Sequence, residues 1–367
     1  MREGWEYKKF ENCIVKSPKL KQVKKEAYNN GSQYPIISQE EKFISGYCDD
    51  ESIVCHIDRP IVVFGDHTRV LKYIDFDFVV GADGVKVIIP IKSIDSKFLL
   101  YFLQWYNIPN LGYSRHYKLL KDVMVPIPNC TTQQTIISEL DKLNKLIHIK
   151  KEQLKDYDAL AQSIFYEMFG DPVVNEKGWE VKKFGEIGTL ERGAGISKKD
   201  FVDDGLPCIH YGQLHTTFGA YTRKNITFIP KDLLPKYKIA HSGDLILAIT
   251  SEDVEGSCKS TAWLGDYDVV VGSDAAIFHH NQNGIYLSYY TRTKAFYNEK
   301  AKYAKGFKVT HISTKEIASI SICVPPLSIQ NIFANKIEQI EKQKAIIQNI
   351  IMDLETLLAS RMQYWFD

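Results

Sequence analysis

The chain contains two short sequence motifs that each occur twice, and their spacing limits what it can fold into. Residues 4–10 read Gly-Trp-Glu-Tyr-Lys-Lys-Phe and residues 178–184 read Gly-Trp-Glu-Val-Lys-Lys-Phe, an offset of 174 residues (178 − 4). Residues 127–133, Ile-Pro-Asn-Cys-Thr-Thr-Gln, return as residues 324–330, Val-Pro-Pro-Leu-Ser-Ile-Gln, an offset of 197 (325 − 128). Solenoids repeat about every 20–50 residues, so these offsets indicate duplicated domains. The shared motifs frame dissimilar middles, the second longer by 23 residues (197 − 174), which predicts two variable domains on a common scaffold.

A long helical segment follows the second motif in each half. Steps of four and three residues meet apolar or aromatic side chains at nine of ten positions from Ile136 to Met168, and at eight of ten from Phe333 to Trp365. A heptad pattern of this length is typical of a coiled coil, although one amphipathic helix packed on a domain is the alternative. At about 1.5 Å per residue each helix would span roughly 50 Å. Because the helices occupy matched positions, we expect them to pair antiparallel as a rod that holds the two middles apart.

Proline and glycine mark the ends of these helices. Pro128 and the pair Pro325-Pro326 break the preceding structure, and Thr131 or Thr132 and then Ser328 are candidate N-caps. Gly170 suits a C-terminal cap, and Pro172 prevents continuation of the first helix. The expected organisation is a first domain at 1–128, a spacer helix at 129–170, a second domain at 171–325 and a second spacer helix at 326–367.

Composition narrows the class of protein without fixing its ligand. The 367 residues have a net charge of +1, which neither requires nor excludes nucleic acid, and residues 1–30 hold eight Lys or Arg against four Glu. The seven Cys show no regular spacing, which argues against a disulfide framework, and no CxxC or Cys/His pair has zinc-ligand spacing. The sequence has no apolar signal core and no run of 18 apolar residues. We therefore expect a cytoplasmic protein without a bound metal.

Each middle reads as a compact α+β domain. Short β-branched runs alternate with Gly and Asp turns, which is the pattern of strands in a curved or barrel-like sheet. In the first half the strands are expected at 61–64, 78–80 and 85–89, with a short helix at 98–106. In the second half they are expected at 244–249, 269–272 and 275–278, with a matching helix at 285–300.

Basic, polar and aromatic side chains gather on predicted loops of both middles and near the N-terminus. Such side chains read base edges or hold phosphates, although any one cluster taken alone is more often a solvated loop, and a local turn explains Asp66 and His67 equally well. The candidate DNA contacts of the first half are Lys16, Lys19, Lys21, His67, Thr68, Arg69, Arg115, His116 and Lys118. Those of the second half are Lys198, Lys199, Tyr211, Gln213, His215, Lys259, Lys305 and Lys308.

Motifs that carry catalysis are missing from the sequence. Residues 193–197, Gly-Ala-Gly-Ile-Ser, lack the Lys-Ser/Thr ending of a phosphate loop. The serine-hydrolase, zinc-protease and zinc-deaminase motifs do not occur, nor does the Asn/Asp-Pro-Pro-aromatic motif expected of an adenine methyltransferase. Glu252, Asp253 and Glu255 could suggest a metal site, but a solvated acidic turn is the better interpretation. We expect no catalytic residues.

Taken together, these features resemble the specificity subunit (HsdS) of type I restriction–modification systems over essentially the whole chain. The resemblance rests on the Pro-Pro-Leu-Ser-Ile-Gln opening of the second helix, its degenerate counterpart at 128–134, and the junction Phe169-Gly170-Asp171-Pro172 with Asn175 and Gly178-Trp179. Residues 64–69 and 242–246 are also similar to stretches of the family's target-recognition domains. The chain is somewhat short for the family, and its first domain is the shorter one.

The resemblance implies a non-catalytic subunit that recognises DNA sequence. Each domain would read one half of a split, asymmetric double-stranded site, and the paired helices would set the unread gap, with half-site centres roughly one helical turn (34–36 Å) apart. This chain would bind no cofactor. S-adenosylmethionine would belong to two partner methyltransferase subunits, and a motor-nuclease subunit would cut unmodified DNA.

Two other classes of function stay open at this point. A coiled-coil scaffold with two protein-binding ends fits the same helical pattern. Its binding would lack the steep salt dependence that phosphate contacts produce. A stand-alone enzyme is disfavoured by the missing motifs.

Overall fold

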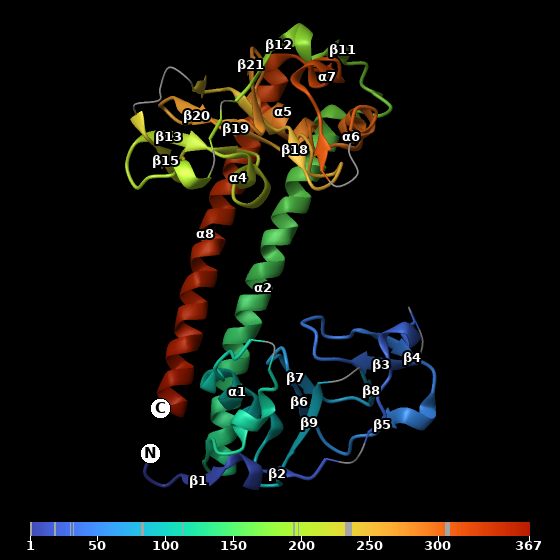
Figure 1. Ribbon diagram of the computed structural model, residues 1–367, viewed down its shortest axis with the longest axis vertical. Helices are drawn as coiled ribbons and strands as arrows, with labels where there is room; N and C mark the ends of the chain where they lie inside the picture. Colours follow the sequence, from blue (N-terminus) through green and yellow to red (C-terminus); the bar gives the residue numbers. More distant parts are fainter. Residues whose placement is uncertain are drawn as a thin grey trace. The chain divides into compact units, whose positions relative to one another are not determined.

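The computed structural model of the protein describes residues 2–17, 20–29, 31, 33–81, 84–112, 114–193, 195–196, 198–231, 237–304 and 309–367. The chain divides into two compact units. Unit 1 is Met1–Glu152 with Gln348–Asp367, and unit 2 is Gln153–Ile347. Helices α2 (Cys130–Phe169) and α8 (Leu327–Phe366) each contribute residues to both units (Figure 1).

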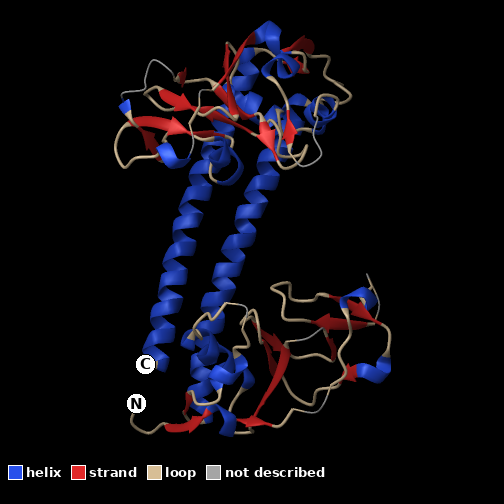
Figure 2. Ribbon diagram, in the orientation of Figure 1, coloured by secondary structure: helices blue, strands red, loops and turns tan. Residues whose placement is uncertain are grey.

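Unit 1 combines small sheets with short helices (Figure 2). Its strands in the described chain are β1 (Glu6–Lys9), β2 (Ile14–Val15), β3 (Tyr34–Ile37), β4 (Gly46–Cys48), β5 (Val54–Cys55), β6 (Ile61–Gly65), β7 (Leu71–Ile74), β8 (Phe78–Val80), β9 (Val85–Pro90) and β10 (Met124–Ile127). Its short helices are η1 (Phe10–Asn12), η2 (Lys25–Ala27), η3 (Glu51–Ile53), α1 (Ser96–Tyr106) and η4 (Tyr117–Leu120). The Asp95 carboxylate caps α1 by accepting from the amides of Lys97 and Phe98, which starts this helix two residues before the expected 98.

Unit 2 has the same kinds of element and several more. Its strands in the described chain are β11 (Glu180–Lys183), β12 (Gly188–Arg192), β13 (Leu206–Ile209), β14 (Tyr221–Thr222), β15 (Thr227–Ile229), β16 (Lys238–Ala240), β17 (Leu245–Ala248), β18 (Thr250–Ser251), β19 (Ser260–Trp263), β20 (Val269–Val271), β21 (Ala275–His280), β22 (Thr310–His311) and β23 (Ser321–Val324). Its short helices are α3 (Phe184–Ile187), η5 (Lys198–Asp200), α4 (Tyr211–Thr216), α5 (Gly284–Tyr290), α6 (Lys294–Ala301) and α7 (Thr314–Ala318).

The duplication seen in the sequence is a duplication of topology. In unit 1 one sheet has the order β4-β3-β8-β5 with β3 and β8 parallel, and in unit 2 one has the order β15-β13-β20-β16 with β13 and β20 parallel. The sheet β2-β9-β6-β7 corresponds to β12-β21-β17-β19, to which unit 2 adds β14. The dissimilar middles therefore fold on the same strand order.

The repeated motifs form the same strand pair in each unit. β1 pairs antiparallel with β10, with Glu6 opposite Ile127, and β11 pairs antiparallel with β23, with Glu180 opposite Val324. Glu180 is Glu6 shifted by 174 (180 − 6), and Val324 is Ile127 shifted by 197 (324 − 127). The two repeated motifs therefore pair in the same strand register in both units, although their sequence offsets differ.

The buried stripe of each long helix follows the predicted periodicity over much of its length, but near the end of α2 the buried rings are Phe165 and Phe169, one residue after the expected Ile164 and Met168, which are half-buried. Ile136, Leu140 and Ile147 are buried on α2, and Phe333, Ile337, Ile340, Ile347 and Ile351 are buried on α8. Gly170 ends α2 with the expected positive φ of 73°. The expected N-caps of α2 are wrong: Asn129 caps it instead, its side-chain oxygen accepting from the amide of Thr132 at 2.8 Å, and Thr131 lies inside the helix. Ser328 likewise lies inside α8, which begins at Leu327.

Two expectations about the middles need correction. The sheets of the described chain are open, with two edge strands each, so barrel closure is not found. The helix expected at 285–300 is two helices, α5 and α6, because the hydroxyl of Thr293 caps α6 and interrupts the run. Within the described residues no helix is long and apolar enough to cross a membrane.

Candidate nucleic-acid interface

In unit 1 the buried carboxylate of Asp66 joins two of the clusters found in the sequence. Its Oδ1 accepts from the amide of Tyr117 at 2.8 Å, and its backbone carbonyl accepts from the amide of His116 at 2.8 Å and from Nδ1 of the same residue at 2.9 Å. Lys86 Nζ lies 3.7 Å from Asp66 Oδ2 and offsets its charge. The turn at 66–69 and the segment at 115–118 therefore form one surface.

The turn itself is held by backbone geometry. Arg69 has a left-handed φ of 63°, and its amide donates to the carbonyl of Gly65 at 2.8 Å. A Cβ at residue 65 would lie 2.2 Å from Thr68 Oγ1, so glycine is required there. Thr68 donates to the carbonyl of Gln39, and the amide of His67 donates to Gln39 Oε1. Arg69 Nη1 donates to the carbonyl of Ile108 at 2.8 Å, and this hydrogen bond holds the side chain against the protein surface.

The candidate contacts of unit 1 differ in their access to a ligand. Lys16, Lys21, Thr68, Arg115 and Lys118 are exposed, while His67 and Arg69 are half-buried. His116 is fully buried, and its Nε2 accepts from the amide of Leu111 at 3.0 Å. The structure therefore places His116 in the support of the loop rather than at its surface. Lys19 lies outside the described residues.

In unit 2 the expected loop at 210–215 is largely the helix α4, with His210 just before its first residue. His210 is the N-cap of α4, its Nδ1 accepting from the amide of Gly212, and burial together with the charge of Lys198 lowers its pKa. Gln213 is buried, accepts from the amide of His210 and donates to Thr227 Oγ1 at 3.0 Å. Gln213 thus holds the helix in place, and the sequence candidates of α4 that stay accessible are Tyr211 and His215.

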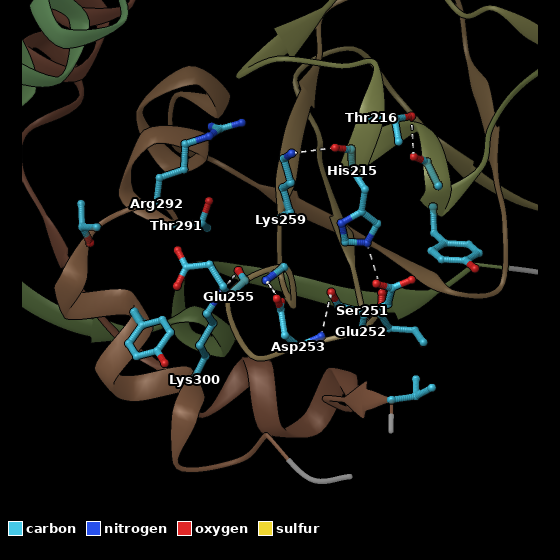
Figure 3. Close-up of a pocket in the computed structure, with 17 residues that line it drawn as sticks. His215, Thr216, Ser251, Glu252, Asp253, Glu255, Lys259, Thr291, Arg292 and Lys300 are labelled. Carbon is cyan, nitrogen blue, oxygen red and sulfur yellow. Dashed lines mark hydrogen bonds between the residues drawn. The ribbon is translucent and has the colours of Figure 1, made fainter. Parts of the chain in front are cut away.

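A cavity of about 830 Å³ brings together three of the candidate contacts of unit 2 (Figure 3). Tyr211 and His215 line it from α4, with ring centroids 6.1 Å apart, and Lys259 lines it from the start of β19. Lys259 Nζ donates to the carbonyl of His215 at 2.8 Å, and His215 Nε2 is bonded to the carbonyl of Thr250 at 3.2 Å. Lys198 and Lys199 lie outside this lining, exposed on η5. Lys305 and Lys308 lie outside the described residues.

Two further cations line this cavity and were not among the sequence candidates. Arg292 lies at the break between α5 and α6, and Lys300 is buried on α6. Lys300 Nζ donates to the carbonyls of Glu255 at 2.8 Å and Ser257 at 2.6 Å, and burial lowers its pKa. The sequence predicts one uninterrupted helix at 285–300. This prediction misses the break between α5 and α6 at which Arg292 is accessible. The Thr-Arg-Thr sequence at 291–293, with a cap residue before α6, is the signal that could have located it.

The acidic residues at 252–255 of the same cavity form a turn that a side-chain hydrogen bond closes. Asp253 Oδ1 accepts from the amide of Gly256 at 2.7 Å, whereas Glu252 and Glu255 are exposed. Across the described chain no group of three His, Cys, Asp or Glu is arranged to hold a metal ion. The cavity therefore offers cations, aromatic rings and hydrogen-bond acceptors, which are the groups used to bind nucleic acid.

A family model described as "Type I restriction modification DNA specificity domain" matches residues 2–156 and 176–356. The specificity subunit of the type I restriction enzyme MjaVIII of Methanocaldococcus jannaschii is 24% identical over 268 residues, which are 64% of this chain and 62% of that protein. The match thus spans less than two thirds of this relative. The EcoR124I/EcoR124II specificity subunit of Escherichia coli is 23% identical over 84% of this chain and 79% of its own.

Solved structures show the same fold. The S subunit of a type I restriction–modification system from M. genitalium superposes with a TM-score of 0.58 at 12% identity, over 99% of this chain and 96% of its own. A chain from a study of complex assembly and conformational transition of the type I R-M system gives 0.57 at 15% identity, over 100% and 98%. Since the family model matches most of the sequence in two copies, the chain belongs to the family of the type I restriction modification DNA specificity domain.

Proposed function

We propose that this chain is the non-catalytic DNA-recognition subunit of a type I restriction–modification complex. The observation that carries the proposal is that both units have one strand order but different side chains at their candidate surfaces. Unit 1 offers Thr68, Arg115 and Lys118, and unit 2 offers Tyr211, His215 and Lys259. Each unit reads one half of a bipartite double-stranded site, and because the surfaces differ, the two half-sites differ.

The two long helices act as the spacer that sets the gap between the half-sites. Within unit 1, Arg361 binds Glu139 and Lys151 Nζ lies 2.7 Å from Glu355, and within unit 2 Lys344 Nζ lies 2.7 Å from Asp158. In unit 1 the later residue of α2 is matched with the earlier residue of α8, and in unit 2 Phe165, which follows Asp158, packs on Phe333, which precedes Lys344. Both observations support antiparallel pairing as a coiled coil. The domain limits are 1–128, 129–170, 171–325 and 326–367.

The partners follow from this role. Two methyltransferase subunits bring S-adenosylmethionine and methylate adenine, and a motor-nuclease subunit cuts unmodified DNA, so this chain binds no cofactor itself. The location is the cytoplasm, and the seven cysteines, none of which is in a disulfide, support a reducing compartment.

Exchange of one domain tests the proposal. Replacing residues 1–128 by the corresponding domain of another family member should change one half-site of the methylated sequence and leave the other unchanged. A change in both half-sites would contradict the modular account.

Salt dependence separates the proposal from a protein-binding scaffold with a coiled coil. DNA binding through several phosphates should weaken by orders of magnitude between 50 and 200 mM salt, on the order of 10³-fold or more for six contacts. Binding that is insensitive to salt would favour the scaffold.

A further inference from the structure

The cavity of unit 2 has charges of both signs, and two of its cations, Lys259 and Arg292, form no ion pair with its carboxylates (Figure 3). Lys259 donates to a backbone carbonyl, and Arg292 donates to the carbonyls of Ser288 at 2.6 Å and Ser260 at 3.0 Å. Neither cation has a carboxylate of the described chain within ion-pair distance, whereas the third cation of the cavity, Lys300, feels the negative charge of Glu255. A surface without a charged ligand would be expected to pair Lys259 and Arg292 with nearby carboxylates.

The two cations stand close together. Besides the large cavity, both line a second one of about 400 Å³. Burial, and next to it the positive charge of Arg292, lower the pKa of Lys259. Like charges held side by side repel each other, and a bound anion offsets that repulsion.

The two cations and the backbone of the acidic turn are held in place before any ligand arrives. The guanidinium of Arg292 is fixed by the carbonyl oxygens at the end of α5 and the start of β19. In the acidic turn, Lys300 donates hydrogen bonds to the carbonyls of Glu255 and Ser257, and the Asp253 carboxylate accepts one from the amide of Gly256. A site whose groups are already oriented loses less entropy when it binds.

We propose that this cavity receives one nucleotide of the bound DNA, with its phosphate on Lys259 and Arg292 and an amino group of its base on Glu252 or Glu255. A nucleotide has this distribution of groups: an anionic phosphate at one end, which Arg and Lys bind, and on cytosine or adenine an exocyclic amino donor at the other. A lone phosphate would leave the carboxylates without a donor. The inference rests on the proposed function and deepens it, because it assigns phosphate and base contacts to named residues of one half-site reader.

The phosphate contact is tested with the full chain in complex with its methyltransferase subunits. Lys259→Met should weaken binding to specific and unrelated duplexes alike and reduce the slope of log affinity against log salt by about 1. Lys315→Met is the matched control, because Lys315 is exposed on α7 and outside the cavity lining; its slope should equal that of the wild type. Lys259→Arg should restore most of the affinity.

A scan of duplexes with single methylphosphonate substitutions locates the contact. One neutralised phosphate in the half-site read by unit 2 should weaken wild-type binding but leave Lys259→Met unaffected. Inorganic phosphate at the same concentration should not compete, which distinguishes a DNA phosphate from a free anion.

The base contact is tested independently by Glu252→Gln and Glu255→Gln. Both residues lie on an exposed turn, so these variants should fold normally. One of them should change the preferred base at a single position of that half-site by roughly 5- to 150-fold, since glutamine reads adenine and a carboxylate accepts from cytosine. The other half-site should be unchanged.

Unchanged base preference in both variants, with no methylphosphonate position coupled to Lys259, would overturn this inference while leaving the proposed function intact. If the wild-type complex showed no sequence-specific DNA binding, the proposed function itself would fail.

Discussion

The side chain of Gln330 on α8 accepts a hydrogen bond from the backbone amide of Asn283, the residue that caps α5, at 3.0 Å. Its Nε2 donates to the carbonyl of Pro325 at 2.7 Å, and the side chain is completely buried. In unit 1 Gln133 repeats this arrangement: it accepts from the amide of Asp95, the cap of α1, at 2.8 Å and donates to the carbonyl of Pro128 at 2.9 Å. One glutamine per unit thus fastens the short helix of the domain to the start of the long helix.

Replacing Gln330 should show what this fastening contributes. Gln330→Met keeps the shape but leaves the amide of Asn283 and the carbonyl of Pro325 without a partner, so the free energy of unfolding should fall by about 1–3 kcal/mol. Gln348→Met, an exposed position on the same helix, should change it by less than about 0.5 kcal/mol. Chemical denaturation of both variants measures the difference, and equal stabilities would refute a structural role for Gln330.

Glu139 should stabilise unit 1 through charge. Arg361 donates to both carboxylate oxygens and Trp365 Nε1 donates to Oε2 at 2.9 Å; the hydrogen bond from Arg361 is the main cause of a lowered Glu139 pKa. A carboxylate with a depressed pKa contributes stability above its unfolded pKa and loses it as the pH falls through the folded pKa. Glu139→Gln should therefore cost about 0.5–1 kcal/mol at pH 7, less than a buried pair because both side chains are partly exposed.

The pH dependence separates that charge effect from a packing effect. The stability difference between Glu139→Gln and the wild type should shrink as the pH falls below about 4.5. Glu355→Gln, which breaks an exposed pair with Lys151, is the control and should have little effect at any pH. A difference for Glu139→Gln that stays constant from pH 7 to 3 would show that its charge is not the cause.

His280 should make unit 2 sensitive to mild acid. Burial lowers its pKa to about 4, its Nδ1 accepts from the amide of Gln282 at 3.2 Å, and its buried Nε2 has no partner in the described chain. Because the unfolded chain binds this proton near pH 6.5, stability should fall as the pH drops from about 6.5 to 4, by about 3 kcal/mol. His280→Asn keeps an acceptor for Gln282 and should flatten the stability curve over that interval. A curve that keeps its slope would place the acid sensitivity elsewhere.

The spacer role of the helices predicts a change in the DNA site. One heptad added to both α2 and α8 lengthens each by roughly 10 Å, so the unread gap should grow by about three base pairs with both half-sites unchanged. Sequencing of the methylated motif measures this directly. A heptad added to one helix only should disturb the register and abolish specific methylation. An unchanged gap in the double insertion would remove the spacer role.

Periodicity made the long helices predictable because it follows from burial along one face. The two misfits in the stripe of α8 have a physical reason. Lys344 pairs with Asp158, and Arg361 pairs with Glu139, so both polar positions face a carboxylate of the opposite helix within their unit. Sequence spacing cannot show such pairs until the register of the two helices is known.

The candidate surfaces were less predictable, because chemistry alone does not reveal exposure. His116 and Gln213 have side chains suited to DNA, yet both are buried and bonded within the protein. Arg292 escaped notice because its access depends on a break between two helices that a helical pattern conceals. Lys259 and Tyr211 lie 48 residues apart (259 − 211), and only the fold brings them to one cavity.

The most direct test of the central claim maps N6-methyladenine by single-molecule sequencing, in cells that carry this chain with its methyltransferase subunit and in cells that carry the methyltransferase alone. A split, asymmetric motif should be methylated only when this chain is present. The domain exchange at residues 1–128 should then alter one half of the motif. The same methylation with and without the chain, or a symmetric motif, would contradict the account.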